Sequence, residues 1–206
     1  MRRLVVLFSL LMPVCVLSQE PFDRLGQRSM MKGDFESAAN YFEKAYAADK
    51  SNMNALYLMG YSAYHATDYK RSIKAFDKLL AFKPDESIAY YYRGKAKMNL
   101  CALIKEVAST DRESLLQGAI RDFSFGIDLS PGDLKFYQNR GLAYQEYGMY
   151  KSQKVNGVYN KNIALNSANA SISDLRKVLD ENSGRRDIIN QIDRSKQLLI
   201  DINRQP

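Results

Sequence analysis

A glycine recurs along this chain at a spacing of 34 residues that lengthens at the last interval, and this repetition restricts the possible folds. Gly26, Gly60, Gly94 and Gly141 are 34, 34 and 47 residues apart. Further columns keep the same register: an apolar column (Phe42, Phe76, Phe123, Leu175), a small-residue column (Ala38, Ser72, Ala119, Ser171) and a column containing Pro84 and Pro131. Agreement among four columns indicates an internal repeat, which means an array built from one small structural unit.

Each unit reads as helix, turn, helix. In the first, Leu25, Gly26 and Ser29 share one helical side, and Gly33-Asp34 breaks that helix. Ala38, Phe42 and Ala45 then recur at helical spacing on a second helix. The small columns indicate a close helix crossing with no room for a side chain, and the proline column ends the second helix.

The two longer units carry insertions, and subtraction locates them. The glycine-to-aromatic interval is 16 residues in units one and two, but 29 and 34 in units three and four. Both insertions therefore fall inside a helix pair. We expect residues 99–118 to lengthen both helices by about two turns, with Thr110 and Glu113 forming a capping box. The Asn-rich stretches at residues 155–157 and 160–169 predict at least part of a loop.

With these motifs in place, the units resemble tetratricopeptide repeats. The resemblance is carried by three motifs, Phe22-x-x-Leu25-Gly26…Ala38…Phe42, Leu56-x-x-Met59-Gly60…Phe76…Pro84 and Tyr90…Gly94…Ala119…Phe123…Pro131, and more weakly by a fourth, Tyr137…Gly141…Ser171…Leu175. It implies an all-α, right-handed superhelical solenoid of about four helix pairs plus a C-terminal capping helix.

The expected boundaries follow from the columns. The repeats should span about residues 19–52, 53–86, 87–133 and 134–183, which together make a repeat domain of residues 19–183. Residues 184–206 read as an amphipathic helix with Ile188, Ile192 and Leu199 on one side. A terminal cap is the preferred interpretation, because repeat arrays must bury their last open face. A dimerisation helix is the alternative.

The N-terminus has the pattern of a secretory signal peptide over residues 1–18. Arg2 and Arg3 precede an apolar run, and small residues stand before the expected cleavage after Ser18. An uncleaved anchor and a lipoprotein modified at Cys15 are the alternatives. We therefore expect an exported protein of the bacterial periplasm or cell envelope, with no integral membrane segment after cleavage.

Charge and cysteine content limit which class of partner the chain binds and which disulfides it can form. The formal charge is +7, from 30 basic and 23 acidic residues, and two of the basic residues are Arg2 and Arg3. The remaining basic residues are interspersed with acids rather than gathered in a stripe, which disfavours nucleic acid as a partner. The mature chain would keep only Cys101, so no internal disulfide can form.

In proteins that this chain resembles, ligands lie in a concave groove lined by the first helix of each pair. The matching positions here are Tyr57, Tyr61, Tyr64, His65, Tyr91, Lys95, Asn99, Lys135 and Gln138, with Asp23, Gln27, Met30, Met98, Leu142 and Gln145 beside them. Three of the tyrosines stand at i, i+4 and i+7, so they share a helix face. They can either grip a peptide or pack between helices, while Tyr90 and Tyr92 are expected to pack.

A catalytic or metal site is not predicted. The chain has a single histidine, His65, and the mature protein a single cysteine, Cys101, on different repeats. Neither a phosphate-binding loop nor zinc-ligand spacing is present in the sequence. The family's carboxylate clamp of Lys, Asn and Arg is matched in type only by Lys135. We expect a protein that is not an enzyme and carries no cofactor.

Two functions remain open from the sequence. The first is an exported scaffold that binds a protein or peptide in its concave groove, within a cell-envelope assembly. The alternative is a structural subunit or assembly factor that contacts partners through its convex face and its inserted helices.

Overall fold

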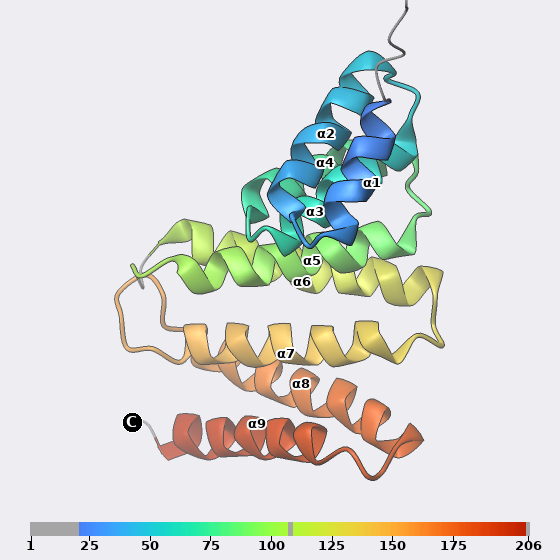
Figure 1. Ribbon diagram of the computed structural model, residues 1–206. Coiled ribbons are helices and arrows are strands. Elements are labelled where there is room, and N and C mark those ends of the chain that lie inside the picture. Colours follow the sequence, from blue (N-terminus) through green and yellow to red (C-terminus); the bar gives the residue numbers. More distant parts are fainter. Residues whose placement is uncertain (1–20, 107–108, 205–206) are drawn as a thin grey trace, which may run out of the picture.

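The computed structural model describes residues 21–106 and 109–204, and the predicted signal peptide, residues 1–18, lies outside them (Figure 1). Within the described residues the chain forms nine helices and no strand. They are α1 (Phe22–Met31), α2 (Phe35–Ala48), α3 (Met53–His65), α4 (Tyr69–Phe82), α5 (Ser87–Leu103), α6 (Thr110–Leu129), α7 (Leu134–Lys151), α8 (Lys161–Glu181) and α9 (Arg186–Arg204). The prediction of four helix pairs and a terminal helix is confirmed.

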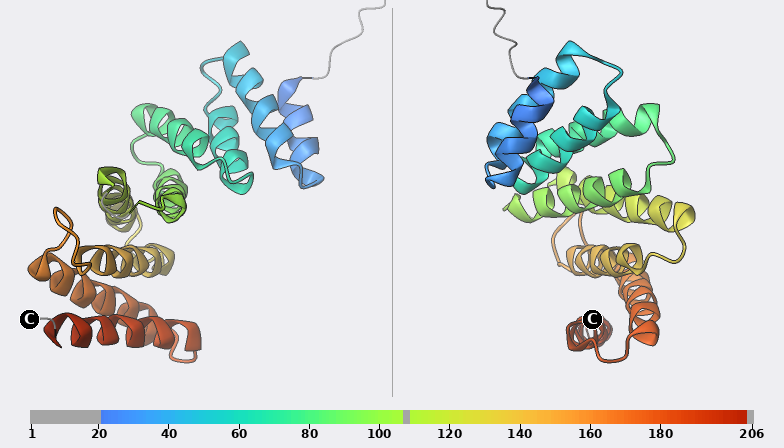
Figure 2. Two further views of the ribbon diagram at one scale, coloured as in Figure 1. Left: turned by 90° about the vertical axis from the view of Figure 1, so that its left-hand side faces the viewer. Right: turned by 45° about the vertical axis from the view of Figure 1, so that its right-hand side comes forward.

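The helices stack in chain order into a curved array (Figure 2). Each helix packs against the next one, and odd-numbered helices also touch each other: α3 contacts α5, α5 contacts α7, and α7 contacts α9. Because these first helices of each pair approach one another, they line the inner face of the curve. None of the helices in the described part of the chain is long and apolar enough to cross a membrane.

Short polar residues cap the starts of several helices. The side chains of Asp34, Asn52, Asp68 and Asn160 each accept a hydrogen bond from the backbone N–H three residues later. Such caps satisfy donors that have no partner within the helix. The turn between α1 and α2 uses Gly33 at a φ of 76°, a left-handed conformation that glycine adopts without strain.

The glycine column lies under the aromatic column. A Cβ on Gly26 would lie 2.7 Å from the Phe42 ring, and one on Gly94 would lie 2.8 Å from the Phe123 ring. Phe42, Phe76 and Phe123 are completely buried. The close approach of the two helices in each pair therefore depends on a missing side chain at this position.

Buried ion pairs replace apolar contacts in the third and fourth pairs. Repeats one and two place Leu25 and Met59 one residue before the recurring glycine, whereas repeats three and four place arginines there. Arg93 and Lys97 both contact the buried carboxylate of Asp122, the latter at 2.7 Å. Arg140 contacts Asp174 at 2.7 Å in the same way. These contacts tie α5 to α6 and α7 to α8.

The helices of repeat three are lengthened by less than predicted. Helix α5 has 17 residues and α6 has 20, against 13 and 14 in α3 and α4, so the helices gain about one and about one and a half turns. The N-cap of α6 is Ser109 rather than Thr110. The predicted capping box is wrong because the carboxylate of Glu113 instead contacts Tyr147 and Lys151 of α7, at 2.9 and 3.0 Å.

The insertion of repeat four is more helical than predicted. The loop is confined to residues 152–160, and the Asn-rich stretch from Lys161 onward belongs to α8. Its buried face consists of small residues (Ala164, Ser167, Ala168, Ser171), while its asparagines point to solvent (Asn162, Asn166, Asn169). Small residues carry little apolar signal, so the sequence pattern concealed a helix that packs closely.

Helix α9 covers the end of the array. Ile188, Ile192, Ser195 and Ile202 are buried against the preceding helices, and most of the outer surface is charged or polar. This arrangement matches a terminal cap, which shields the last apolar face from water.

We expect Gly94→Val to destabilise the fold by about 2 kcal/mol, because the added side chain overlaps the Phe123 ring. Thermal and denaturant unfolding followed by circular dichroism measure the loss. Gly132→Ala is the matched control, since a Cβ at Gly132 meets nothing within 4 Å. Equal stability of the two variants would contradict the proposed close packing.

The ion pair can be tested against its apolar counterpart in repeat two, where Met59 and Ala75 hold the equivalent positions. Asp122→Ala should lower the free energy of unfolding by about 3 kcal/mol, because two cations lose their buried partner. Adding Arg93→Met should restore part of that loss, because one of the two cations is then replaced by an apolar side chain while Lys97 keeps its charge. Denaturant unfolding measures both, and a double variant less stable than Asp122→Ala would refute the equivalence of the pairs.

Candidate functional site

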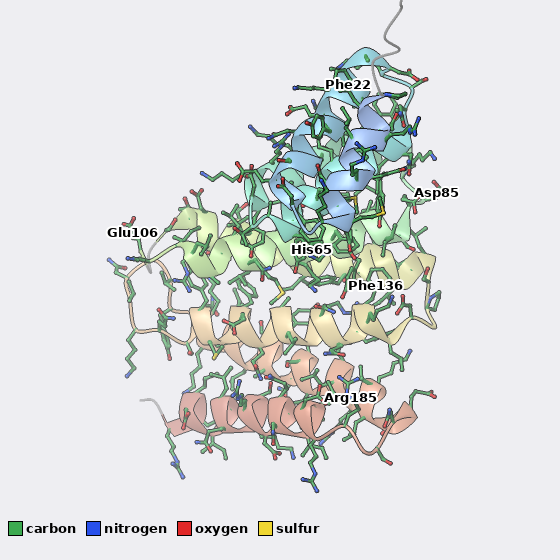
Figure 3. All side chains as sticks on the ribbon, in the orientation of Figure 1. Phe22, His65, Asp85, Glu106, Phe136 and Arg185 are labelled. Atoms are coloured by element: carbon green, nitrogen blue, oxygen red, sulfur yellow. The ribbon has the colours of Figure 1, made fainter. Side chains whose placement is uncertain are left out.

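A continuous group of aromatic rings lies where α3 meets α2 and α5 on the inner face. We call it the aromatic surface; its members are Phe35 of α2, Tyr57, Tyr61, Tyr64 and His65 of α3, and Tyr91 and Tyr92 of α5. Figure 3 marks its position through His65, at the end of α3 above the middle of α5. Four of the predicted groove residues on α3 and one on α5 are thus brought together.

The rings touch in an unbroken series along α3. Ring centroids are 6.3 Å apart for Tyr57 and Tyr61, 4.4 Å for Tyr61 and His65, and 5.3 Å for His65 and Tyr64. Phe35 stacks on His65 at 4.9 Å. Offset and edge-on contacts of this kind stabilise aromatic groups beyond simple burial, so the surface is held in a defined shape.

The tyrosines of α3 combine packing contacts with solvent-exposed area. Tyr57, Tyr61 and Tyr64 are each half-buried. Tyr57 also lies 6.1 Å from the core ring of Phe76. One side of each ring therefore packs against the fold while another remains open to solvent, and the exposed sides form a surface without loosening the core.

Tyr90 and Tyr92 differ from each other, although both were expected to pack. Tyr90 is buried and donates a hydrogen bond from its hydroxyl to the carbonyl of Pro84 at 3.1 Å. Tyr92 is half-buried and contacts Tyr61 at 5.1 Å and Tyr64 at 5.5 Å. The prediction holds for Tyr90, whereas Tyr92 belongs to both the core and the aromatic surface.

Two lysines and an asparagine extend the aromatic surface across α5 and α7. The ammonium of Lys95 lies 5.3 Å from the ring centroids of both Tyr64 and Tyr91, and that of Lys135 lies 5.7 Å from Tyr91. Asn99 donates a hydrogen bond to the Tyr64 hydroxyl at 3.2 Å. The structure therefore joins all three of these predicted residues to the tyrosines.

Other predicted groove residues are engaged elsewhere. Gln138 accepts a hydrogen bond from Arg185 at 3.2 Å, next to the start of α9. Gln145 is buried and donates hydrogen bonds to Ser195 and to the Gln191 carbonyl, so its placement in the groove was wrong. Helix α9 packs where the first helix of a fifth repeat would lie, so it covers this part of α7. The spacing of four repeats in the sequence does not reveal this contact.

Burial and neighbouring charges alter the acidity of the groups at the site. Burial, together with the positive charge of Lys95, lowers the pKa of His65 below its usual value of 6.5. Burial and neighbouring phenol groups raise the pKa of Tyr92, and burial raises that of Tyr57. At neutral pH the hydroxyl groups of Tyr57 and Tyr92 are therefore uncharged, and Lys95 beside the aromatic surface is positively charged.

Two pockets flank the aromatic surface. One of about 290 Å³ lies at the N-terminal ends of α3 and α5, beside Tyr57, Glu86 and Ile88. The other, of about 410 Å³, lies where α5 ends and α6 begins, and sequence reasoning missed it. Only the unequal helix lengths of repeat three produce it, so no motif could have indicated it.

Catalytic groups do not converge here. Cys101 is buried, and this burial raises the pKa of its thiol, which disfavours a reactive thiolate. His65 is exposed, contacts the rings of Phe35, Tyr61 and Tyr64, and does not pair with a carboxylate in any contact of the described residues. Among those same residues, His, Cys, Asp and Glu side chains form no group suited to a metal ion.

We expect a titration of the single histidine by NMR to give a pKa below 6.5 for His65. Lys95→Gln should move this pKa upward, because a nearby positive charge is removed. Since protonation is harder in the folded state, the free energy of unfolding should fall as the pH drops from about 6.5 through the folded pKa. An unchanged pKa in Lys95→Gln would show that the two groups do not interact.

Comparison with known proteins agrees with this architecture. Residues 29–98 match the family model "Tetratricopeptide repeat". No curated protein sequence matches the chain.

Three solved structures illustrate the likeness in fold. MamA from Desulfovibrio magneticus RS-1 is 18% identical, with a TM-score of 0.54 over 89% of this chain and 93% of that one. A thermophilic TPR protein of Thermus thermophilus is 15% identical, with a TM-score of 0.51 over 87% and 97%. The second TPR domain of human RPAP3, solved with an HSP70 peptide, is 19% identical, with a TM-score of 0.51 over 60% and 92%. The chain thus has the fold of a tetratricopeptide repeat solenoid, and residues 29–98 carry the sequence pattern of that repeat.

Proposed function

We propose that this protein is an interaction scaffold that binds an extended segment of a partner protein along the aromatic surface. The observation that carries the proposal is the row of half-exposed rings on α3 and α5, joined by Lys95 and Asn99. Tyrosines suit this purpose because each offers a large apolar contact at low conformational cost and a hydroxyl for the partner's backbone.

The fold supports the same proposal. Odd-numbered helices line the inner face of a curved array, and solenoids of this kind use such faces as extended binding surfaces. Human RPAP3 is an example in which a TPR domain holds an HSP70 peptide. This chain offers tyrosines at Tyr57 and Tyr61 rather than the Lys and Asn side chains of a carboxylate clamp, so the proposed partner is held by aromatic contacts along its length.

The proposal also includes the cellular location of the protein. Residues 1–18 have the composition of a secretory signal peptide, with Arg2 and Arg3 ahead of an apolar run. Export to the periplasm or cell envelope would make an envelope protein the natural partner. N-terminal sequencing of the protein purified from cell fractions tests both cleavage after Ser18 and location.

Exposed apolar side chains on the even-numbered helices favour a second candidate function. Phe82 of α4 is 63% exposed, and Phe125 and Leu129 of α6 are 51% and 42% exposed. Side chains of this size on an outer helix suit a contact between subunits. A structural or assembly role through the convex face would use these residues instead of the tyrosines.

Pull-down of partners from an envelope extract of the source organism separates the two functions. Tyr61→Ala/Tyr64→Ala should weaken capture of a specific partner at least about tenfold, because central aromatic contacts dominate such interfaces. Tyr57 is left intact because its ring packs on core Phe76. Tyr159→Ala, which removes a partly exposed tyrosine in the loop before α8, is the matched control.

Circular dichroism must first show that each variant is folded. A partner that the wild type and Tyr159→Ala retain, and that the double variant loses, supports the aromatic surface. If the double variant keeps the partner but Phe82→Ser/Phe125→Ser loses it, the convex face is the binding surface and the first proposal is wrong.

A further inference from the structure

The extension of repeat three adds a surface that the other pairs lack. The ends of α5 and α6 project past the turn between α3 and α4, on the left in Figure 1. Figure 3 shows the same projection by the separation of Glu106, beyond the end of α5, from His65, at the end of α3. Helix α3 therefore does not extend alongside the last turn of α5.

An apolar pocket occupies this projection. Its volume is about 410 Å³, and its lining comprises Leu100, Leu103 and Ile104 at the end of α5, Asp111, Ser114 and Leu115 of α6, and Lys70 of α4. Leu103 is 65% exposed, although burial of a leucine side chain would lower the free energy. The four aliphatic side chains thus offer a site for another apolar group.

This pocket continues the aromatic surface along one helix face. Lys95, Asn99 and Leu103 stand at i, i+4 and i+8 on α5, so their side chains follow one another along the same side. Asn99 is joined to Tyr64 by a hydrogen bond, and Tyr64 contacts Tyr69, the neighbour of the pocket residue Lys70. A segment that lies over the tyrosines can therefore reach the pocket without crossing another helix.

The opposite end of this path carries positive charge. Lys95 and Lys135 both lie over the Tyr91 ring. Lys135 has Asp133 at 3.3 Å, whereas Lys95 has no carboxylate within ion-pair distance among the residues that the structure describes. A carboxylate on a bound segment would complement Lys95.

We propose that the projection of repeat three is a specificity pocket for the segment that binds the aromatic surface; this rests on the proposed function. Lys95 and Leu103 are eight residues apart on α5, or about 12 Å at the rise of an α-helix. An extended chain covers this distance in about four residues. The bound segment therefore carries an Asp or Glu over Lys95 and, about four residues away, a large aliphatic or aromatic side chain in the pocket.

Selection from a display library of random linear peptides of about 12 residues, long enough to span both features, tests this inference on the purified protein. The enriched peptides should share an acidic residue and a large apolar residue about four positions apart. The most enriched peptide is then synthesised with a fluorescent label, and its affinity is measured by anisotropy. Leu103→Ser should weaken binding about tenfold, as should alanine at the peptide's apolar residue.

The two changes should not add, because each removes the same contact. Ile200→Ser is the control: Ile200 is also an exposed aliphatic side chain, at 44%, and it lies on α9, which contributes to neither the pocket nor the aromatic surface. Lys95→Gln should abolish the preference for an acidic residue over its amide in the synthetic peptide.

The outcomes distinguish this inference from the function on which it rests. If Tyr61→Ala abolishes peptide binding while Leu103→Ser binds as the wild type does, the pocket inference is wrong and the aromatic surface stands. If the enriched peptides bind Tyr61→Ala and Leu103→Ser as tightly as they bind the wild type, both proposals fail. Loss of affinity in Leu103→Ser with no acidic preference in the peptides would overturn the assignment of Lys95.

Discussion

The packing of each helix pair is set by a contact between a glycine of one helix and a large apolar side chain of the next. A Cβ at Gly26, Gly60 or Gly94 would overlap a phenylalanine ring, and at Gly141 it would lie 2.9 Å from Leu175. This approach sets how closely the two helices of a pair can lie. Dense packing then leaves little freedom in the placement of the following pair, so a local contact is propagated into the curvature of the whole array.

Residues of α5 belong to or pack against each of the three clusters of buried side chains in the array, and the two largest meet at this helix. One cluster of buried side chains extends from Ala38 to Tyr90, and a second from Ala119 to Ile192. The three consecutive tyrosines of α5 divide between them: Tyr92 packs against the first cluster and Tyr91 against the second. The pairs on the two sides also differ in chemistry, because Asp122 and Asp174 form buried ion pairs only in the later repeats. Such pairs stabilise little in net terms but penalise wrong partners, so they help each helix select its neighbour.

The aromatic surface lies at this junction, and its position explains its form. Tyr61 and Tyr64 of α3 meet Tyr92 of α5 where the first core ends, so their rings are fixed by packing on one side and open on the other. Side chains that are already immobilised lose less entropy when a partner binds. The neighbouring projection of α5 and α6 adds an apolar pocket. Rigid rings beside an exposed leucine therefore suit recognition of an extended segment.

Spacing within a helix or between equivalent positions is enough to predict the repeat, the helix pairs, the close crossing at Gly60 and Gly94, and the shared face of Tyr57, Tyr61 and Tyr64. Features that depend on neighbouring helices appear only in the folded chain. The Asn-rich start of α8 is helical because its alanines and serines pack closely, Gln145 is buried because α9 covers it, and Tyr92 reaches the surface because α3 lies beside it. The pocket at Leu103 likewise results from unequal lengths of adjacent helices. Periodicity fixes which side of a helix a residue occupies, but the contacts of that side are set by how far each neighbouring helix extends.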